Sequence, residues 1–164
     1  MKERTGTIVF VIKDGEVLLA KKTRVLGIGL WNGYGGGFDP ELDKDLFDCA
    51  VREFGEESGG ASIVKDCLEK VAYIEFHNGD KFIFKATVFI ANKIVGVPTD
   101  SEEMIEPTWF PIEGLPSKDQ FMDSDVHWIP LILKGEKIIA DVWYDGNFIL
   151  NERGVEIRKV DTFD

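Results

Sequence analysis

Short apolar runs, several of them alternating with polar residues, dominate the chain and predict a protein rich in β-strands. The first two runs, residues 7–12 and 16–22, flank Asp14-Gly15, a pair that is typical of tight hairpin turns. Further strands are predicted over residues 69–77, 81–94 and 108–112, and a final hairpin over residues 137–146 and 147–160. Asn78-Gly79 predicts the turn between the third and fourth strands.

Two segments have the periodicity of helices. In residues 45–58 the apolar side chains form one stripe, made of Leu46, Phe47, Ala50, Val51 and Phe54. A second helix is predicted over residues 123–133, although Pro130 is unfavourable inside it. Residues 26–38 are rich in glycine, which lets backbone approach a ligand closely, and residues 97–107 are expected to form a loop. The whole pattern predicts a single domain over residues 1–164, of the α+β class, with helices against an antiparallel or mixed sheet.

The first predicted helix carries an unusual concentration of charge. Glu53, Glu56 and Glu57 follow Arg52 directly, just before the helix stops at Gly59-Gly60. At a helical step of about 100° per residue, Glu53 and Glu57 lie beside the apolar stripe, with Glu56 slightly further round. Like charges three and four residues apart repel by about 0.2–0.5 kcal/mol per pair, and solvent, a basic side chain or a metal ion would each offset that repulsion. Carboxylates at the edge of the core lose part of their solvation, so their presence there indicates a functional site more than a solvated surface.

Composition narrows the class of function. The net charge is −11, which disfavours an extended grip on a nucleic-acid polymer but leaves a small phosphorylated substrate possible, because a bound cation reverses the local field. Cys49 and Cys67 show no metal-binding or disulfide spacing and are expected to be reduced thiols of a cytoplasmic protein. Charged residues interrupt the N-terminal apolar run, so neither a signal peptide nor a membrane span is expected.

The string "REFGEESGG", residues 52–60, resembles the core of the Nudix box, GX5EX7REUXEEXGU, in which U is a bulky aliphatic residue. The chain departs from that pattern in three places. Lys44 stands where the pattern has its first glutamate, the spacing from Gly37 to Arg52 is one residue longer, and Gly60 replaces the final U. We expect Asp43 or Glu41 to replace the missing glutamate, whose part in the family is mainly to support the box through the arginine.

The resemblance implies the Nudix α/β/α sandwich, with the box as a catalytic loop-helix-loop, and hydrolysis of a nucleoside diphosphate derivative with Mg²⁺ or Mn²⁺. It places Arg52, Glu53, Glu56 and Glu57 in catalysis, with Glu53 or Glu57 as the general base. Carboxylates at this helical spacing converge, and their oxygens are the ligands that Mg²⁺ prefers. The implied metal-site residues are Gly37, Glu53, Glu56, Glu57 and Glu103.

Beyond the box, the order of several short motifs is similar to that in Nudix enzymes that remove oxidised purine nucleoside triphosphates such as 8-oxo-dGTP from the nucleotide pool and so protect DNA. These motifs are "VLLAKK", "LWNGYGGG", "SEEM", "LPSKD", "HWIPLIL" and "KVDT". The resemblance implies a nucleotide-binding set of Thr7, Lys22, Asn32, Phe76, Asp123, Asp125 and Trp128. Two acids in one apolar pocket would not both ionise, so one could donate and the other accept a hydrogen bond from an oxopurine.

Other interpretations remain open at this level. Each aromatic residue named above could serve core packing alone, Asn32 could only shape the turn before Gly33, and Lys22 could be solvated. A Nudix hydrolase of nucleotide sugars, dinucleoside polyphosphates or ordinary dNTPs would carry the same box. A nucleotide sensor without catalysis is a third possibility, given Lys44 and the longer loop. The expected assembly is a monomer or weak homodimer, with a small nucleotide as the partner.

Overall fold

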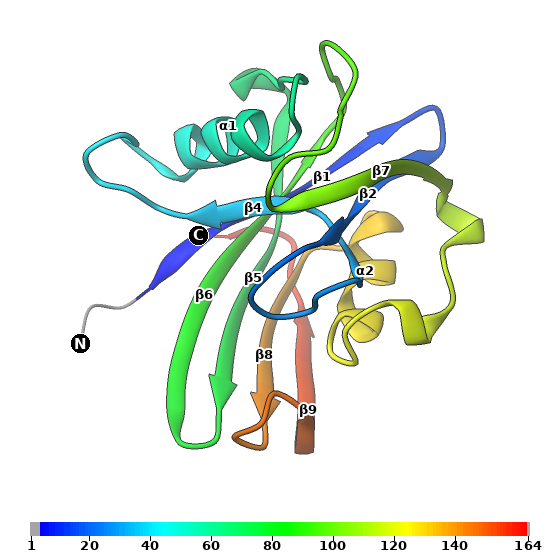
Figure 1. Ribbon diagram of the computed structural model, residues 1–164. Coiled ribbons are helices and arrows are strands. Elements are labelled where there is room, and N and C mark those ends of the chain that lie inside the picture. The colour runs from blue at the N-terminus through cyan, green and yellow to red at the C-terminus, as the bar shows by residue number, and fades with distance from the viewer. Residues whose placement is uncertain (1–3, 164) are drawn as a thin grey trace.

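A computed structural model describes residues 4–163, which form one nine-stranded mixed sheet with two α-helices (Figure 1). The strands and helices are β1 (Thr5–Lys13), β2 (Glu16–Lys22), β3 (Trp31–Asn32), β4 (Tyr34–Gly37), α1 (Leu46–Glu57), β5 (Leu68–Asn78), β6 (Lys81–Ala91), β7 (Met104–Pro111), α2 (Asp125–Leu133), β8 (Ile138–Tyr144) and β9 (Leu150–Lys159). This architecture confirms the predicted α+β class.

The sheet runs in the order β3-β2-β1-β6-β5-β8-β9, with β4 paired to β1 and β7 paired to β2. The pairs β1–β6 and β5–β8 are parallel, whereas the three sequential hairpins are antiparallel. In the first hairpin Asp14 and Gly15 both have positive φ, 52° and 77°, as a two-residue turn between twisted strands requires. The predicted hairpins at Asp14-Gly15 and Asn78-Gly79 are therefore confirmed.

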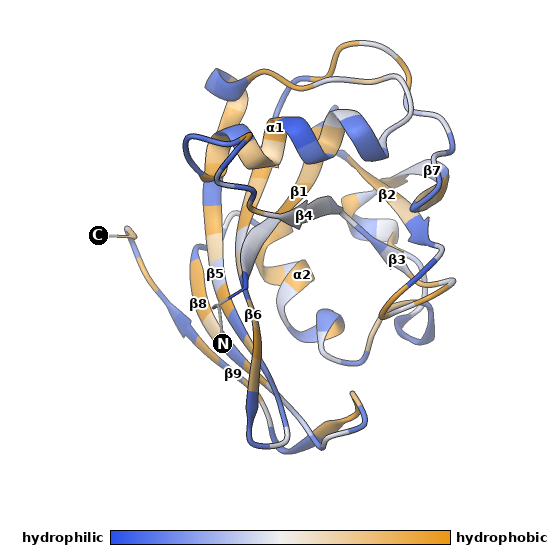
Figure 2. Ribbon diagram, turned by 60° about the vertical axis from the view of Figure 1, so that its left-hand side comes forward, coloured by the Kyte–Doolittle hydropathy of each residue, from blue (hydrophilic) through white to orange (hydrophobic). Residues whose placement is uncertain are grey.

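The two helices cover opposite faces of the sheet, because successive side chains of a strand point to opposite sides. Val9 and Val11 of β1 belong to the core cluster that includes Ala50 and Phe54 of α1. Phe10, between them, belongs to the other cluster, with Trp128 of α2. Figure 2 shows the hydrophobic segments of the central strands passing between α1 and α2. The layers are those of an α/β/α sandwich.

Three local features differ from the prediction. β7 begins at Met104, so the end of the loop predicted over residues 97–107 is strand, because residues 104–111 pair with β2. The glycine-rich passage contains two short strands, β3 beside β2 and β4 beside β1. β4 approaches β1 so closely that a Cβ at Gly35 would lie 1.8 Å from the Thr7 carbonyl oxygen. α2 begins at Asp125 and keeps Pro130 inside it.

The distal ends of β6, β5, β8 and β9 extend past both helices, as Figure 1 shows. One face of these strand ends borders the cavity described below, and the other face carries charged and aromatic side chains. Among residues 4–163, no helix has the length and apolar character that crossing a membrane would need.

Candidate active site

Helix α1 presents the glutamates of the box. Its N-terminus is capped by Asp45, whose side chain accepts a hydrogen bond from the Asp48 backbone N–H at 2.9 Å. Its apolar face packs on the sheet, and the turn that ends it uses Gly59 at φ 71°, where a Cβ would lie 2.3 Å from Thr99 Oγ1. These local signals set where the helix starts and stops, and thereby which residues its rim carries.

The glutamates differ in burial as the angular prediction requires. Glu57 is buried, the Glu53 side chain is 14% exposed, and the Glu56 side chain is 58% exposed. Glu57 also accepts a hydrogen bond from the Gly35 backbone N–H at 2.8 Å, which ties the last turn of α1 to β4. The prediction that these carboxylates lie at the rim of the core is confirmed.

Arg52 holds the box together. Its guanidinium donates from Nε to Asp43 Oδ1 and from Nη2 to Asp43 Oδ2, both at 2.8 Å, and from Nη1 to Glu53 Oε1 at 2.9 Å. Glu56 lies further off, at 3.4 Å, and the Gly37 carbonyl accepts a hydrogen bond at 3.1 Å. A paired fork of this kind fixes orientation as well as charge.

Asp43 thus makes the contact expected of the missing glutamate. Its side chain is buried, and the Arg52 guanidinium holds the pKa of this carboxyl below its usual range. Glu41 is exposed, and Lys44 contributes only its backbone N–H, donated to Asp48 Oδ2 at 3.1 Å. Of the two alternatives left open by the sequence, the structure selects Asp43, which follows Gly37 at the spacing of the family pattern, so the extra residue lies between Asp43 and Arg52.

A second pair of carboxyls meets beside α1. Burial, and then a hydrogen bond with Glu103, raise the pKa of Glu57 to about 8, while the same contact and Arg24 lower the pKa of Glu103. Arg24 also forms an ion pair with Glu103. Two negative charges so close together are unfavourable, which is why the pKa values of the two carboxyls shift in opposite directions.

Glu53 has its own close neighbour. A Cβ at Gly36 would lie 2.4 Å from the Glu53 carboxyl carbon, so only glycine leaves room for this side chain in its observed place. Burial raises the pKa of Glu53, although Arg52 opposes that effect. The glycines of β4 consequently shape the space in which the carboxylates stand.

These residues fit a divalent cation. Glu53, Glu56, Glu57 and Glu103, with the Gly37 carbonyl, offer hard oxygen donors of the kind that Mg²⁺ binds. A cation bound between Glu57 and Glu103 would offset the repulsion that shifts the pKa values of these two carboxyls. A separate group of possible metal ligands lies elsewhere in residues 4–163. It consists of Glu75, His77 and Asp141, whose donor atoms all lie within 4.8 Å of one another.

A cavity of about 590 Å³ opens beside α1. One set of its lining residues surrounds the carboxylates and includes the glycines of β4, Glu57, Glu103, Lys22 and Arg24. The other set is largely apolar and includes Ile8, Phe76, Ile83, Phe84, Met122, Asp125, Tyr144 and Phe148. Such a combination of apolar walls and few polar groups is typical of a small-molecule site.

Asp125 is the acidic residue of the apolar part. Its Oδ1 accepts hydrogen bonds from Ser124 Oγ at 3.3 Å and Trp128 Nε1 at 3.2 Å, while its Oδ2 has no partner among the described residues. Ser124 Oγ in turn lies 2.6 Å from the Tyr144 hydroxyl. Burial raises the pKa of Asp125 to about 7, so near neutrality its free oxygen can act as donor or acceptor.

The cavity gathers most of the predicted nucleotide-binding residues, but not all. Thr7, Lys22, Asn32, Phe76 and Asp125 line it. Trp128 is not among the lining residues, because its side chain is fully buried in the core, three residues along α2 from Asp125, and its contact with a base stays a prediction.

Asp123 does not line the cavity either. Its Oδ2 accepts a hydrogen bond from the Leu150 backbone N–H at 3.1 Å and so anchors the start of β9. Ser124, the extra residue between the two acids, turns inward and is fully buried. The two-acid pocket expected from the sequence therefore contains one acid in the structure.

Several lining residues escaped the sequence analysis. Phe84 lies directly opposite Phe76 across the β5–β6 hairpin because the register shifts between Phe76 and His77. Regular pairing from the turn would have placed Ile83 there instead, so the sequence alone does not indicate Phe84. Arg24 and Tyr144 reach the cavity from a loop and from β8, and no local pattern distinguishes them from ordinary surface and core residues.

Comparisons with known proteins agree with this geometry. A NUDIX domain model matches residues 2–132. The oxidized purine nucleoside triphosphate hydrolase of Mus musculus is 36% identical over 162 residues, covering 98% of this chain and 97% of that protein, and the Danio rerio protein of the same name is 32% identical over 151 residues, covering 92% of each.

Among solved structures, a mutator MutT protein from Bacillus halodurans has the same fold, with a TM-score of 0.74 at 19% identity over 94% of this chain and 97% of that chain. Nudix hydrolases generally use divalent metal ions, in keeping with the oxygen donors gathered here. Since the family model covers most of the chain and the two curated relatives match nearly all of it, this protein belongs to the Nudix hydrolase family.

Proposed function

We propose that this protein hydrolyses nucleoside triphosphates, oxidised purine nucleotides foremost, to the nucleoside monophosphate and pyrophosphate. The observation that carries the proposal is one continuous cavity that joins Glu57 of α1 and Glu103 to a largely apolar part containing Asp125. Its volume of about 590 Å³ lies in the range of small-molecule sites. The names of the Mus musculus and Danio rerio relatives support the same substrate class.

The apolar part would hold the base. Phe76 and Phe84 would pack against its rings, and Asn32 would donate from its amide nitrogen, since its Oδ1 already accepts from the Gly33 N–H at 2.8 Å. Asp125 Oδ2 would pair with the polar edge of the base, as a donor when protonated and as an acceptor when ionised. A buried polar atom without a partner discriminates strongly between ligands, because a ligand that cannot pair with it leaves it unsatisfied.

The polyphosphate would lie toward α1. Lys22 and Arg24 would contribute positive charge there, and the backbone of the β4 glycines would approach the phosphates without side chains in the way. This placement puts the scissile linkage next to Glu57 and Glu103.

Glu53, Glu56, Glu57, Glu103 and the Gly37 carbonyl would hold Mg²⁺ or Mn²⁺, which would neutralise phosphate charge and acidify an attacking water. Glu53 or Glu57 would accept the proton of that water. Glu57 is buried and Glu53 partly buried, and burial raises the pKa of each carboxyl above its ordinary value, which makes it a stronger base. Arg52 would keep Glu53 in place instead of contacting the substrate. Asp43 would in turn keep Arg52 in place.

The test is product analysis after incubation with 8-oxo-dGTP, 2-oxo-dATP, dGTP and ADP-ribose, each with Mg²⁺. Release of pyrophosphate from an oxidised purine nucleotide, at a higher kcat/KM than from dGTP, supports the proposal. Preference for ADP-ribose would indicate a Nudix hydrolase of another substrate class. Thermal stabilisation by nucleotides without any phosphate release would indicate a sensor and would overturn the catalytic proposal.

We further propose that residues 1–164 act as one domain in the cytoplasm, as a monomer or weak homodimer. In support, β8 and β9, which lie beyond the region matched by the family model, complete the same sheet and supply Tyr144 to the cavity. Sedimentation of the full chain at several concentrations would measure its assembly.

A further inference from the structure

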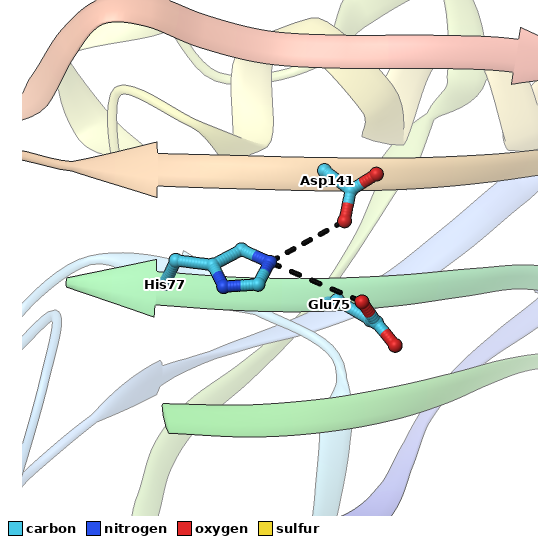
Figure 3. A group of neighbouring side chains, drawn as sticks. All are labelled: Glu75, His77 and Asp141. Atoms are coloured by element: carbon cyan, nitrogen blue, oxygen red, sulfur yellow. Dashed lines mark hydrogen bonds and ion pairs between the residues drawn. The ribbon is translucent and has the colours of Figure 1, made fainter. Parts of the chain in front are cut away.

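On the sheet face opposite the cavity, three potential metal ligands meet at the distal ends of β5 and β8. His77 Nε2 lies 3.4 Å from Asp141 Oδ1 and 3.9 Å from Glu75 Oε2, and all three donor atoms lie within 4.8 Å of one another. Figure 3 shows the imidazole directed at both carboxylates, with Glu75 and His77 on one strand and Asp141 on the next. We call Glu75, His77 and Asp141 the β5–β8 triad.

The imidazole of the triad is held in place by neighbouring rings. His77 stacks on Trp143 with ring centroids 3.9 Å apart and an interplanar angle of 10°, and Phe82 contacts it edge-on at 5.7 Å. Arg153 packs over the same indole at 3.6 Å. A ligand fixed by packing before the ion arrives loses little conformational entropy on binding it.

The register of the sheet places like charges side by side in the triad. Glu75 is the direct partner of Asp141 in the parallel β5–β8 pair, an arrangement that destabilises a sheet unless something offsets it. Lys85 lies 3.7 Å from Glu75 on one side. On the other side the β9 partner of Asp141 is a further carboxylate, Glu156, which pairs with Arg153. A cation bound between Glu75 and Asp141 would offset the repulsion that this register creates.

We propose that the β5–β8 triad is a second divalent metal site, distinct from the carboxylates of α1, and that it takes Zn²⁺. Zinc–ligand bonds of about 2.0–2.2 Å in a tetrahedron put neighbouring donors about 3.3–3.6 Å apart. The His77–Asp141 separation of 3.4 Å already lies in this range, and a small movement of the Glu75 side chain would bring in its oxygen from 3.9 Å. One imidazole with two carboxylates suits a borderline ion such as Zn²⁺ better than Mg²⁺. The partial exposure of Glu75 and Asp141 leaves the fourth position to water.

The position of the triad gives the ion a structural effect. Phe76, between Glu75 and His77, and Tyr144, next to Trp143, line the cavity on the other face. A bound ion would cross-link β5 to β8 directly behind these two side chains. Zinc should therefore stabilise the fold and stiffen the wall of the cavity without touching its contents.

The test measures metal binding to the full chain in two ways, by calorimetric titration with Zn²⁺ and by quenching of tryptophan fluorescence with Co²⁺. Excess Mg²⁺ is present in both so that it occupies the carboxylates of α1. Because His77 stacks on Trp143, Co²⁺ at the triad should quench that indole. We expect His77→Asn and Asp141→Asn to weaken Zn²⁺ and Co²⁺ binding at least tenfold and to abolish the zinc-induced rise in Tm. Trp143→Phe should remove the quenching by Co²⁺ but leave the calorimetric heat of Zn²⁺ binding unchanged.

Matched variants separate this site from the one on α1. Glu57→Gln should leave the triad signals intact, and Glu69→Gln, an exposed change on the same strand, should leave all signals intact. The proposal is overturned if Zn²⁺ binding is the same in His77→Asn as in the wild type, or if it is lost in Glu57→Gln alone. Circular dichroism of each variant distinguishes a lost ligand from a lost fold.

Discussion

Arg52 and Asp43 are joined by two parallel hydrogen bonds of 2.8 Å between a guanidinium and a buried carboxylate. The pair links the loop before α1 to the catalytic face of the helix, and the same guanidinium reaches Glu53. The first glutamate of the family pattern is absent from this chain, but Asp43 makes the contact with Arg52 that we expected of that glutamate.

Replacement of Asp43 by asparagine should therefore destabilise the protein and disturb Glu53. Removing one partner of a buried ion pair costs about 3–5 kcal/mol, because the other charge is left unpaired. We expect a drop of this size in the free energy of unfolding by urea, together with lower activity. Glu41→Gln, an exposed change in the same loop, is the control and should change neither quantity; equal effects of the two would contradict the assignment of Asp43.

Glu56→Gln should separate catalysis from folding. The Glu56 side chain is largely exposed and has only a 3.4 Å contact with Arg52, so the variant should unfold at the wild-type urea concentration. Loss of a metal ligand should nevertheless reduce kcat by about a hundredfold or more, since a metal contributes several kcal/mol to the transition state. Nucleotide binding should stay measurable by calorimetry. A turnover rate like that of the wild type would remove Glu56 from the mechanism.

Gly36→Ala tests whether the glycines of β4 make room for Glu53. The new methyl group would lie 2.4 Å from the Glu53 carboxyl and should push that flexible side chain aside at small cost in stability. We expect a fall in kcat of about tenfold or more, the range seen when groups that orient a ligand are disturbed. The control change Gly55→Ala, on the exposed side of α1, meets open space, so its activity should stay near that of the wild type. Similar losses in both variants would rule out the steric explanation.

The buried carboxyl of Asp125 should make the stability of the fold fall as the pH rises toward neutrality. Burial raises its pKa to about 7 from an ordinary value of 3.8, so between these values the folded protein holds a proton that the unfolded chain releases. Its contribution to stability is therefore greatest below about pH 4 and falls as the pH rises to 7, by at most about 1.4 kcal/mol per pH unit.

Asparagine at this position cannot ionise, so Asp125→Asn should lack this component. Urea unfolding of both proteins between pH 5 and 8 should show the difference in unfolding free energy shifting in favour of the variant up to about pH 7, and then levelling. A difference that stays constant with pH would mean that Asp125 is already ionised in the folded protein.

The same residue should also separate binding from folding at the base pocket. Asp125→Asn should change the preference between 8-oxo-dGTP and 2-oxo-dATP, because an amide offers fixed donors and acceptors where a carboxyl can exchange them. Asp123→Asn should leave that preference unchanged, since the Asp123 carboxylate accepts from the Leu150 N–H outside the cavity. Competition kinetics with the two nucleotides measures both, and a shift in Asp123→Asn alone would reverse the assignment.

The sequence by itself determined the hairpins, the extent of α1 and the clustering of its glutamates. These features depend on neighbours within a few residues: turn pairs such as Asp14-Gly15, the cap at Asp45 and the helical spacing of Glu53 and Glu57. Short-range stereochemistry decides them, and it is written directly in the order of the residues.

Only the tertiary structure decided which of two nearby acidic residues contacts Arg52 and which of two others lines the cavity. Asp43 instead of Glu41 meets Arg52, and Asp125 instead of Asp123 faces the cavity, because a one-residue change in a loop rotates a side chain toward or away from a distant partner. The β5–β8 triad depends likewise on a parallel pairing between strands more than sixty residues apart. Contacts across such distances depend on the register of the whole sheet, which no local pattern in the chain specifies.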